Sequence, residues 1–220
     1  MGGILIGLLG DYPGVGKDTS AALLAERHGF EVFSFARKLY AEASEAYGIP
    51  VEEWQRRDLK EVPQARFALI HCRDEQFRQV AAALLLKESG RCPLEQILRV
   101  RLAPRQILRW WGTEFRRVGY GEDYWTRPVF SKILERPNGR HVITDTRLGN
   151  ELFATVRLGG YIGRILRPSA APEKLSDHPS EVLARMWPED FVIHNEGDKD
   201  WLAQQWETQV PRLRKRGRAA

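Results

Sequence analysis

The sequence predicts an α/β fold in which helices cover both faces of a parallel sheet. Short apolar segments typical of buried strands alternate along the chain with longer segments typical of helices. A glycine-rich loop joins the first such strand to the first helix. In sheets of this kind ligands bind beyond the carboxyl ends of the strands, so functional side chains are expected there.

The first strand and the loop after it are the most informative stretch. Residues 4–9 are apolar, and a helical pattern begins near Ala21. Between them lies Gly10-Asp11-Tyr12-Pro13-Gly14-Val15-Gly16-Lys17-Asp18-Thr19. Glycines let backbone N–H groups converge on phosphate oxygens, and the positive end of a helix adds to the attraction. The pattern predicts a phosphate-binding loop, with Lys17 reaching the β- and γ-phosphates of a nucleotide.

Two positions depart from the strict phosphate-loop pattern. Asp11 stands where the pattern has its first glycine, and Gly10 lies one place early. Asp18 follows the lysine, so the hydroxyl comes one position later at Thr19. The alternative interpretation is a glycine-rich turn that binds nothing. We favour phosphate binding because strand, lysine, hydroxyl and helix stand in the expected order.

The remaining elements follow in order. Residues 30–35 alternate like a strand, and a helix over 36–47 ends at Gly48-Ile49-Pro50. Residues 51–102 read as several helices, the pattern of an inserted helical lobe, and Pro104 begins another helix. Strands are expected at 141–144, 161–166 and 191–194, and helices at 151–157 and 200–213. We expect a single domain over 1–220, with a mobile, lid-like loop at 169–180 and a solvated basic tail at 211–220.

Composition limits the class of protein. The chain has 220 residues, of which 43% are hydrophobic and 29% charged, as in a soluble globular protein. No membrane span or signal peptide is visible, and the two cysteines have no metal or redox spacing, so we expect a cytoplasmic protein. The net charge of +5 equals the five basic side chains of the tail, since the rest is balanced. This balance argues against a dedicated nucleic-acid-binding domain.

Several side chains at the predicted strand ends are suited to nucleotide chemistry. Asp145 either organises Mg²⁺ or caps the next helix. Arginine forks bind phosphoryl oxygens in pairs, and we favour Arg105, Arg147 and Arg167 over Arg116, Arg117 and Arg164, which we expect at the surface. Trp111 and Trp125 are candidates for stacking on a base, although core packing is the commoner role.

The motifs together resemble a known family, the bacteriophage deoxynucleoside monophosphate kinases, relatives of adenylate kinase. The resemblance rests on blocks that span almost the whole chain in order, at residues 16–19, 35–36, 105 with 111–114, 123–125, 143–147, 165–168, 177–181 and 193–197. It implies an adenylate-kinase-like P-loop kinase with three layers and a substrate-binding helical lobe. It also implies ATP as phosphoryl donor, Mg²⁺, transfer to a deoxynucleotide, a homodimer and a place in phage DNA precursor synthesis.

The resemblance also implies site residues. ATP would lie on Gly14, Val15, Gly16, Lys17, Asp18, Thr19, Arg167, Asn195 and Gly197. The deoxynucleotide would lie among Phe35, Ala36, Arg37, Lys38, Lys60, Arg105, Trp111, Gly112, Thr113, Trp125, Asp145, Arg147 and Glu181. Lys17, Arg105, Asp145 and Arg147 would be catalytic, with Thr19 and Asp145 near the metal. The family often has a lysine where this chain has Tyr40, so Arg37 or Lys38 is expected to replace it.

Two alternatives to a deoxynucleotide kinase remain open. One is another small-molecule P-loop kinase, of the dephospho-coenzyme A or phosphomevalonate type, which the identity of the acceptor would distinguish. The other is a DNA-associated P-loop protein that uses the basic tail. The charge balance of residues 1–210 argues against it.

Overall fold

The computed structural model describes residues 3–90, 92–171 and 179–216. The chain forms two compact units. One, the sheet unit, comprises Met1–Phe35 and Thr126–Ala220, and the other, the helical unit, is the continuous segment Ala36–Trp125. Across the described ranges, no helix combines the length and apolar character needed to cross a membrane.

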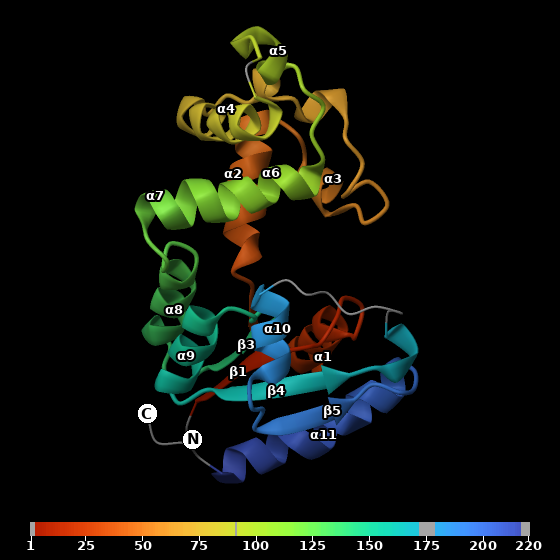
Figure 1. Cartoon of the computed structure of the whole chain (residues 1–220). Helices are drawn as coiled ribbons and strands as arrows, with labels where there is room; N and C mark the ends of the chain where they lie inside the picture. The colour runs from red at the N-terminus through yellow and green to blue at the C-terminus, as the bar shows by residue number, and fades with distance from the viewer. Residues whose placement is uncertain (1–2, 91, 172–178, 217–220) are drawn as a thin grey trace. The chain divides into compact units, whose positions relative to one another are not determined.

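The sheet unit is built on five parallel strands (Figure 1). They are β1 (Ile4–Leu9), β2 (Glu31–Phe33), β3 (Arg140–Ile143), β4 (Tyr161–Leu166) and β5 (Phe191–His194), in the order β2-β3-β1-β4-β5. The wholly buried β1 pairs with β3 on one side and β4 on the other. The predicted α/β fold with a parallel sheet is therefore confirmed.

Helices cover both faces of this sheet. Alternate side chains of a strand point to opposite faces, so the apolar side chains of β1 need cover on both. Ile6 and Leu8 of β1 pack in one core with α1 (Lys17–His28) and α11 (Lys199–Arg216). Leu9 packs in a second core with α9 (Gly149–Arg157) and α10 (Pro179–Met186). The sheet unit also contains α8 (Thr126–Glu135) and a short 3₁₀ helix, η4 (Pro168–Ala170). The result is the expected three-layer arrangement.

The last helix is longer than its sequence predicts. Pro211 lies inside α11, which continues to Arg216, so residues 211–216 of the expected solvated tail are helical. Leu213 explains why, because its side chain is only 1% exposed in the core that α1 and α11 share. Burial of this leucine holds the helix together past the proline. Residues 217–220 lie outside the described part of the chain.

The helical unit begins earlier and ends later than the lobe expected at 51–102. It contains α2 (Ala36–Tyr47), α3 (Val51–Gln55), α4 (Glu75–Ser89), α5 (Leu94–Leu98) and α6 (Pro104–Trp110), with the 3₁₀ helices η1 (Ala65–Phe67) and η2 (Leu69–His71). Its core is aromatic: Trp54 and Phe67 are fully buried and their ring centroids lie 4.8 Å apart. An aromatic core buries much apolar surface per residue, as a small unit requires.

The helix that begins at Pro104 continues through three segments, of which the middle one is π-helical. After α6 the chain forms a π-helical stretch, η3 (Trp111–Arg117), and then α7 (Val118–Tyr120). Such stretches are rare and often occur at functional sites. Here it contains Gly112 and Thr113, both expected to contact substrate.

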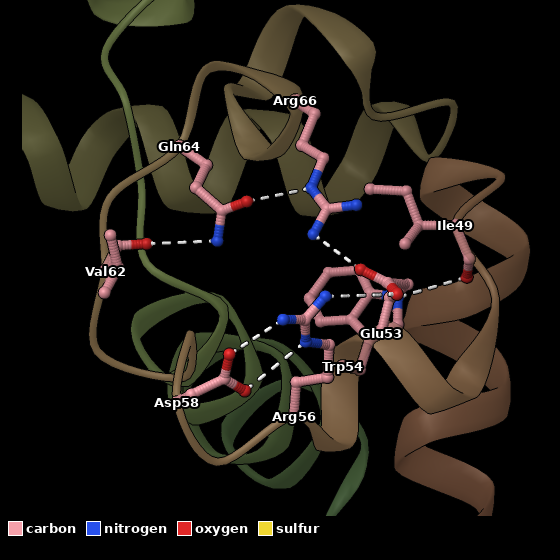
Figure 2. Close-up of polar contacts among 8 residues, drawn as sticks. All are labelled: Ile49, Glu53, Trp54, Arg56, Asp58, Val62, Gln64 and Arg66. Carbon is pink, nitrogen blue, oxygen red and sulfur yellow. Dashed lines mark hydrogen bonds and ion pairs between the residues drawn. The ribbon is translucent and has the colours of Figure 1, made fainter.

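A polar network fixes the segment between α3 and η1 (Figure 2). The Arg56 guanidinium pairs with Asp58 at 2.7 Å, and Arg66 pairs with Glu53 at 2.8 Å. Each exposed pair contributes little to stability. Together they define the course of a loop that carries Lys60 and Glu61.

Candidate functional site

The phosphate loop has the backbone geometry that its glycines permit. Gly14 has a φ of 87° and Gly16 a φ of 104°, both in the left-handed region. Gly16 is also the N-cap of α1, and it has no side chain to bond the first N–H groups of the helix. The N-terminus of α1 therefore faces the loop with backbone donors suited to an anion.

Lys17 lies against the start of this loop. A Cβ built on Gly10 would stand 3.2 Å from Lys17 Nζ and 2.4 Å from a methyl carbon of Val15. Only glycine fits at position 10, although the strict pattern places its glycine one residue later. The ammonium thus lies inside the loop, where a phosphate would bind.

The loop is braced from the ends of β4 and β5. The buried Asn195 side chain donates a hydrogen bond from Nδ2 to the Val15 carbonyl at 2.8 Å. The Tyr12 hydroxyl donates to the Arg167 carbonyl at 2.7 Å. Asn195 therefore holds the loop itself, a role that sequence reasoning, which placed it near adenine, did not foresee.

Arg164 is not a surface residue, contrary to expectation. It is 6% exposed, and its guanidinium pairs with Asp11 and, at 3.0 Å, with Glu189. Its remaining donors bond the carbonyls of Ala184, Arg185 and Trp187 at 3.1, 3.3 and 2.7 Å. These bonds satisfy a charge that burial would otherwise make costly. A lone arginine within the apolar strand sequence 161–166 was the available signal.

Asp145 joins the ends of two strands. Its carboxylate accepts hydrogen bonds from the Ser34 hydroxyl at 2.8 Å and from the Phe35 N–H at 2.9 Å. The helix-cap interpretation is wrong, because the N-cap of α9 is Leu148. Glu151 instead accepts from the N–H groups of Arg147 and Leu148, at 2.9 and 3.0 Å. Asp145 is thus oriented at the carboxyl edge of the sheet, where the exposed Arg147 follows it.

A second cluster lies in the helical unit. Lys60 Nζ lies 3.2 Å from the Tyr40 hydroxyl. The backbone N–H of Arg105 donates a hydrogen bond to the Lys60 carbonyl at 3.0 Å. The half-exposed Arg105 side chain pairs with Glu61 at 2.7 Å. The structure therefore brings the backbones of Lys60 and Arg105, two predicted substrate residues, together, with the Lys60 side chain beside Tyr40.

The two candidate stacking tryptophans are buried. Trp111 is 1% exposed and Trp125 is 4% exposed. Phe77 packs on Trp111 with ring centroids 4.4 Å apart. The indole N–H of Trp125 donates a hydrogen bond to the Gly112 carbonyl at 2.9 Å. In this structure neither ring face is open to a base, so both follow the commoner core role, as does the buried Trp110.

Glu42 organises this aromatic region, and sequence reasoning missed it. Its carboxylate accepts from the Tyr124 hydroxyl at 2.6 Å, from Arg116 Nε at 2.7 Å and from the Trp111 N–H at 2.9 Å. Arg116 is therefore a partly buried partner here, with a side chain 14% exposed, and its guanidinium also lies 4.2 Å from the Phe115 ring centroid. No local sequence pattern marks a carboxylate whose partners lie 69 to 82 residues away.

Burial and these bonds shift two pKa values. Burial raises the pKa of Glu42, but the hydrogen bonds from Tyr124, Trp111 and Arg116 outweigh it, and the pKa is lowered overall. For Tyr124, burial and the bond to Glu42 raise the pKa to about 12. Lys38 Nζ lies 3.7 Å from Glu42 and 4.0 Å from the Tyr124 ring centroid, so it belongs to the same group.

The other predicted site residues lie as follows. Phe35 is buried against Phe130, Ala36 begins α2, and Arg37 and Thr113 are exposed. Asp18 and Thr19 lie exposed in the first turn of α1, and Arg167 follows β4 half-buried. Gly197 packs so tightly that an added Cβ would meet Trp201 at 2.6 Å. Glu181 lies in α10, but its side chain and residues 172–178 of the expected loop lie outside the described structure.

The strand, glycine-rich loop, lysine and helix define a P-loop protein. A protein of Acanthamoeba polyphaga mimivirus named "Putative deoxynucleotide monophosphate kinase" is 31% identical over 183 residues, covering 83% of this chain and 82% of that protein. The chain belongs to this family of P-loop nucleotide kinases.

Comparison with family models gives no match. Two solved structures are similar, each with a TM-score of 0.46. Dephospho-CoA kinase from Campylobacter jejuni is 13% identical, covering 96% of this chain and 97% of that one. TT1252 from Thermus thermophilus is 19% identical, covering 97% and 99% respectively.

Proposed function

We propose that this protein transfers the γ-phosphoryl group of ATP to a deoxynucleoside monophosphate, giving ADP and a deoxynucleoside diphosphate. The observation that carries the proposal is the similarity to a relative with that printed name, which extends over most of both chains. The phosphate loop and the lysine and arginine cluster of the helical unit supply groups for a donor and an acceptor phosphate.

The donor side rests on the phosphate loop. Lys17 neutralises the β- and γ-phosphates, and the N-terminal amides of α1 bind their oxygens. Phosphoryl transfer needs positioning and charge neutralisation more than a protein base. The brace from Asn195 keeps the loop in one conformation, so ATP binds without first ordering it.

The residues of the sheet unit fit a magnesium ion that is held mainly by phosphates. Mg²⁺ in such sites is bound by one or two carboxylates plus substrate oxygens, so no larger ligand cluster is needed. Asp145 offers an oriented carboxylate and Thr19 an exposed hydroxyl, and these two residues would hold the ion. When bound, Mg²⁺ supplies charge neutralisation at the transferring phosphate.

The acceptor side rests on the cluster around Tyr40. Lys60 brings an ammonium to the place where the family lysine is missing, within 3.2 Å of the Tyr40 hydroxyl. Lys38 is engaged by Glu42 and Tyr124, which makes it a weaker substitute. We therefore assign the acceptor phosphate to Lys60 and Arg105, whose guanidinium releases Glu61 when phosphate binds.

The remaining assignments separate one residue that acts in phosphoryl transfer from residues that shape the acceptor site. Arg147 is exposed beside Asp145, so it is free to move to the transferring phosphoryl group and stabilise its charge. Trp111 and Trp125 form the walls behind the acceptor and do not stack on its base. Gly112 and Thr113, on the π-helical stretch, then present backbone and hydroxyl groups to the nucleotide.

An acceptor screen tests the proposal. ADP release is measured with ATP, Mg²⁺ and each common deoxynucleoside and ribonucleoside monophosphate, with dephospho-coenzyme A and phosphomevalonate in parallel. Turnover with at least one deoxynucleotide, lost in Lys17→Met, is the expected result. Turnover with dephospho-coenzyme A or phosphomevalonate alone would replace the proposal by the other kinase class.

A further inference from the structure

A charge cluster centred on a buried arginine lies beside the phosphate loop, and no step of the transfer described above uses it. Its centre is Arg164 on β4, and its acidic members are Asp11, the second residue of the loop, and Glu189, which follows α10. Strand register explains the contact. Arg164 lies opposite Leu9, the last residue of β1, in the pairing of β1 with β4, and Asp11 comes two residues after Leu9 at the start of the loop.

Asp11 is an unusual residue for this position. It places a carboxylate next to Gly10, over which the Lys17 ammonium lies. A carboxylate here repels the phosphates of a nucleotide and competes with them for Lys17. A phosphate loop can carry this charge only if another group neutralises it.

Arg164 is placed to do so. The guanidinium pairs with Asp11 while its other nitrogens are held by Glu189 and by three carbonyls at the end of α10. Those bonds fix its position, so it cannot turn away to solvent. Its own charge is screened little, because the side chain is only 7% exposed.

We propose that Arg164 is a positioning residue for ATP: it neutralises Asp11 and ties the first turn of the phosphate loop to the C-terminal end of α10. The inference rests on the proposed function only in taking ATP as the ligand of the loop. It gives Asp11, which departs from the usual pattern, a partner that makes the departure compatible with phosphate binding.

The test measures the dissociation constant of ATP·Mg²⁺, without any acceptor, for four folded proteins: wild type, Arg164→Met, Asp11→Asn and the double variant. Asn keeps an acceptor oxygen for Arg164 but has no charge. Arg164→Met should weaken ATP binding by about tenfold or more, as expected when one charge-assisted contact is lost. Asp11→Asn should stay within about threefold of wild type, a change of less than about 0.7 kcal/mol.

The decisive comparison is the double variant, which should bind ATP more tightly than Arg164→Met because it removes the uncompensated carboxylate. A merely structural role predicts the opposite order, since two losses would be at least as harmful as one. Glu135→Gln is the matched control: it removes an exposed carboxylate on α8, outside this cluster, and should leave ATP binding unchanged.

Two further measurements keep the proposal open to refutation. If Arg164→Met does not fold, Arg164→Gln retains amide donors for the α10 carbonyls and enters the same comparison. No rescue by Asp11→Asn in either background would overturn the inference. Failure of the wild-type protein to bind ATP would instead overturn the proposed function.

Discussion

Asn195 Nδ2 lies 2.8 Å from the carbonyl oxygen of Val15 and donates a hydrogen bond to it, although 180 residues separate the two in the chain. The bond links the end of β5 to the centre of the phosphate loop. Both residues are buried, so the bond is not exchanged for one with water. A side chain outside the loop thus helps to set the direction of its backbone donors.

Asn195→Ala should weaken ATP binding without affecting the acceptor. The change leaves a buried carbonyl without its partner, which costs about 1 kcal/mol or more, and the KM for ATP should rise roughly fivefold. Steady-state kinetics with each substrate varied in turn measures this. His194→Ala is the control, because that neighbouring side chain is exposed and should be silent. An equal rise in the KM for the deoxynucleotide would contradict the loop-bracing role.

Lys17→Met should abolish phosphoryl transfer and leave the fold intact. Loss of a preorganised charge at the transferring phosphate costs on the order of 10²-fold or more in kcat. The side chain faces a loop, so the circular dichroism spectrum and the thermal midpoint should match wild type. Lys132→Met, the same substitution on the exposed face of α8, serves as control. Near wild-type turnover in folded Lys17→Met would end the P-loop interpretation.

Lys60→Met should chiefly raise the KM for the deoxynucleotide. A lysine bound to phosphate contributes about 1.5–3 kcal/mol, which corresponds to a rise of roughly 10- to 150-fold. The KM for ATP should not change. Lys87→Met on α4 of the same unit is the matched control, since that side chain is exposed. Should Lys38→Met produce the acceptor defect and Lys60→Met not, the assignment would pass to Lys38.

Glu42 gives the helical unit a pH-dependent contribution to stability. Its pKa is lower in the folded state than the unfolded value of about 4.3, because the bonds from Tyr124, Trp111 and Arg116 outweigh burial. The ionised form therefore stabilises the fold above about pH 4.3, and this contribution is lost as the pH falls through the lower folded pKa.

Urea unfolding of wild type and Glu42→Gln at several pH values tests this. The wild type should be more stable at pH 7, and the difference in unfolding free energy should shrink as the pH is lowered below about 4.3. Glu135→Gln, on an exposed position of α8, should show no such change. A constant difference across this range would mean that Glu42 acts through packing and not through its charge.

Leu213→Ala should destabilise the sheet unit by about 2–5 kcal/mol, the usual cost of emptying a buried leucine site. Leu134→Ala, at a position 57% exposed, should change stability by less than about 0.5 kcal/mol. Thermal unfolding in the absence of nucleotide distinguishes the two. Equal midpoints would show that the helix beyond Pro211 does not contribute to the core.

The sheet and the phosphate loop could be predicted from sequence because their signals are local. The strand over 161–166 is found at Tyr161–Leu166 and that over 191–194 at Phe191–His194, and the helix expected at Pro104 begins there. Each is an apolar run bounded by turn residues or proline. The last helix, expected at 200–213, continues three residues further to Arg216, because the basic residues after the buried Leu213 carry no apolar pattern that marks a helix end.

The site was harder to predict because its partners are distant in sequence. Arginines with local strand-end positions are favoured by sequence, yet Arg164 is buried and Arg116 partly buried, each satisfied by groups that the fold brings from elsewhere. The tryptophans were assigned to a base because aromatic side chains suit one, while their burial depends on Phe77 and Gly112. Sequence identified the right segments but not which atoms face each other within them.

The pairing of β1 has a consequence for synthesis on the ribosome. Ile4 pairs with Arg140, so at about 5–20 residues per second this apolar strand waits roughly 7–27 s for its first partner. The helical unit is a continuous segment that ends at Trp125, before that partner emerges. The middle of the chain can therefore fold while its first strand is still exposed. Nascent-chain chaperones should bind Ile4–Leu9 until β3 and β4 have been made.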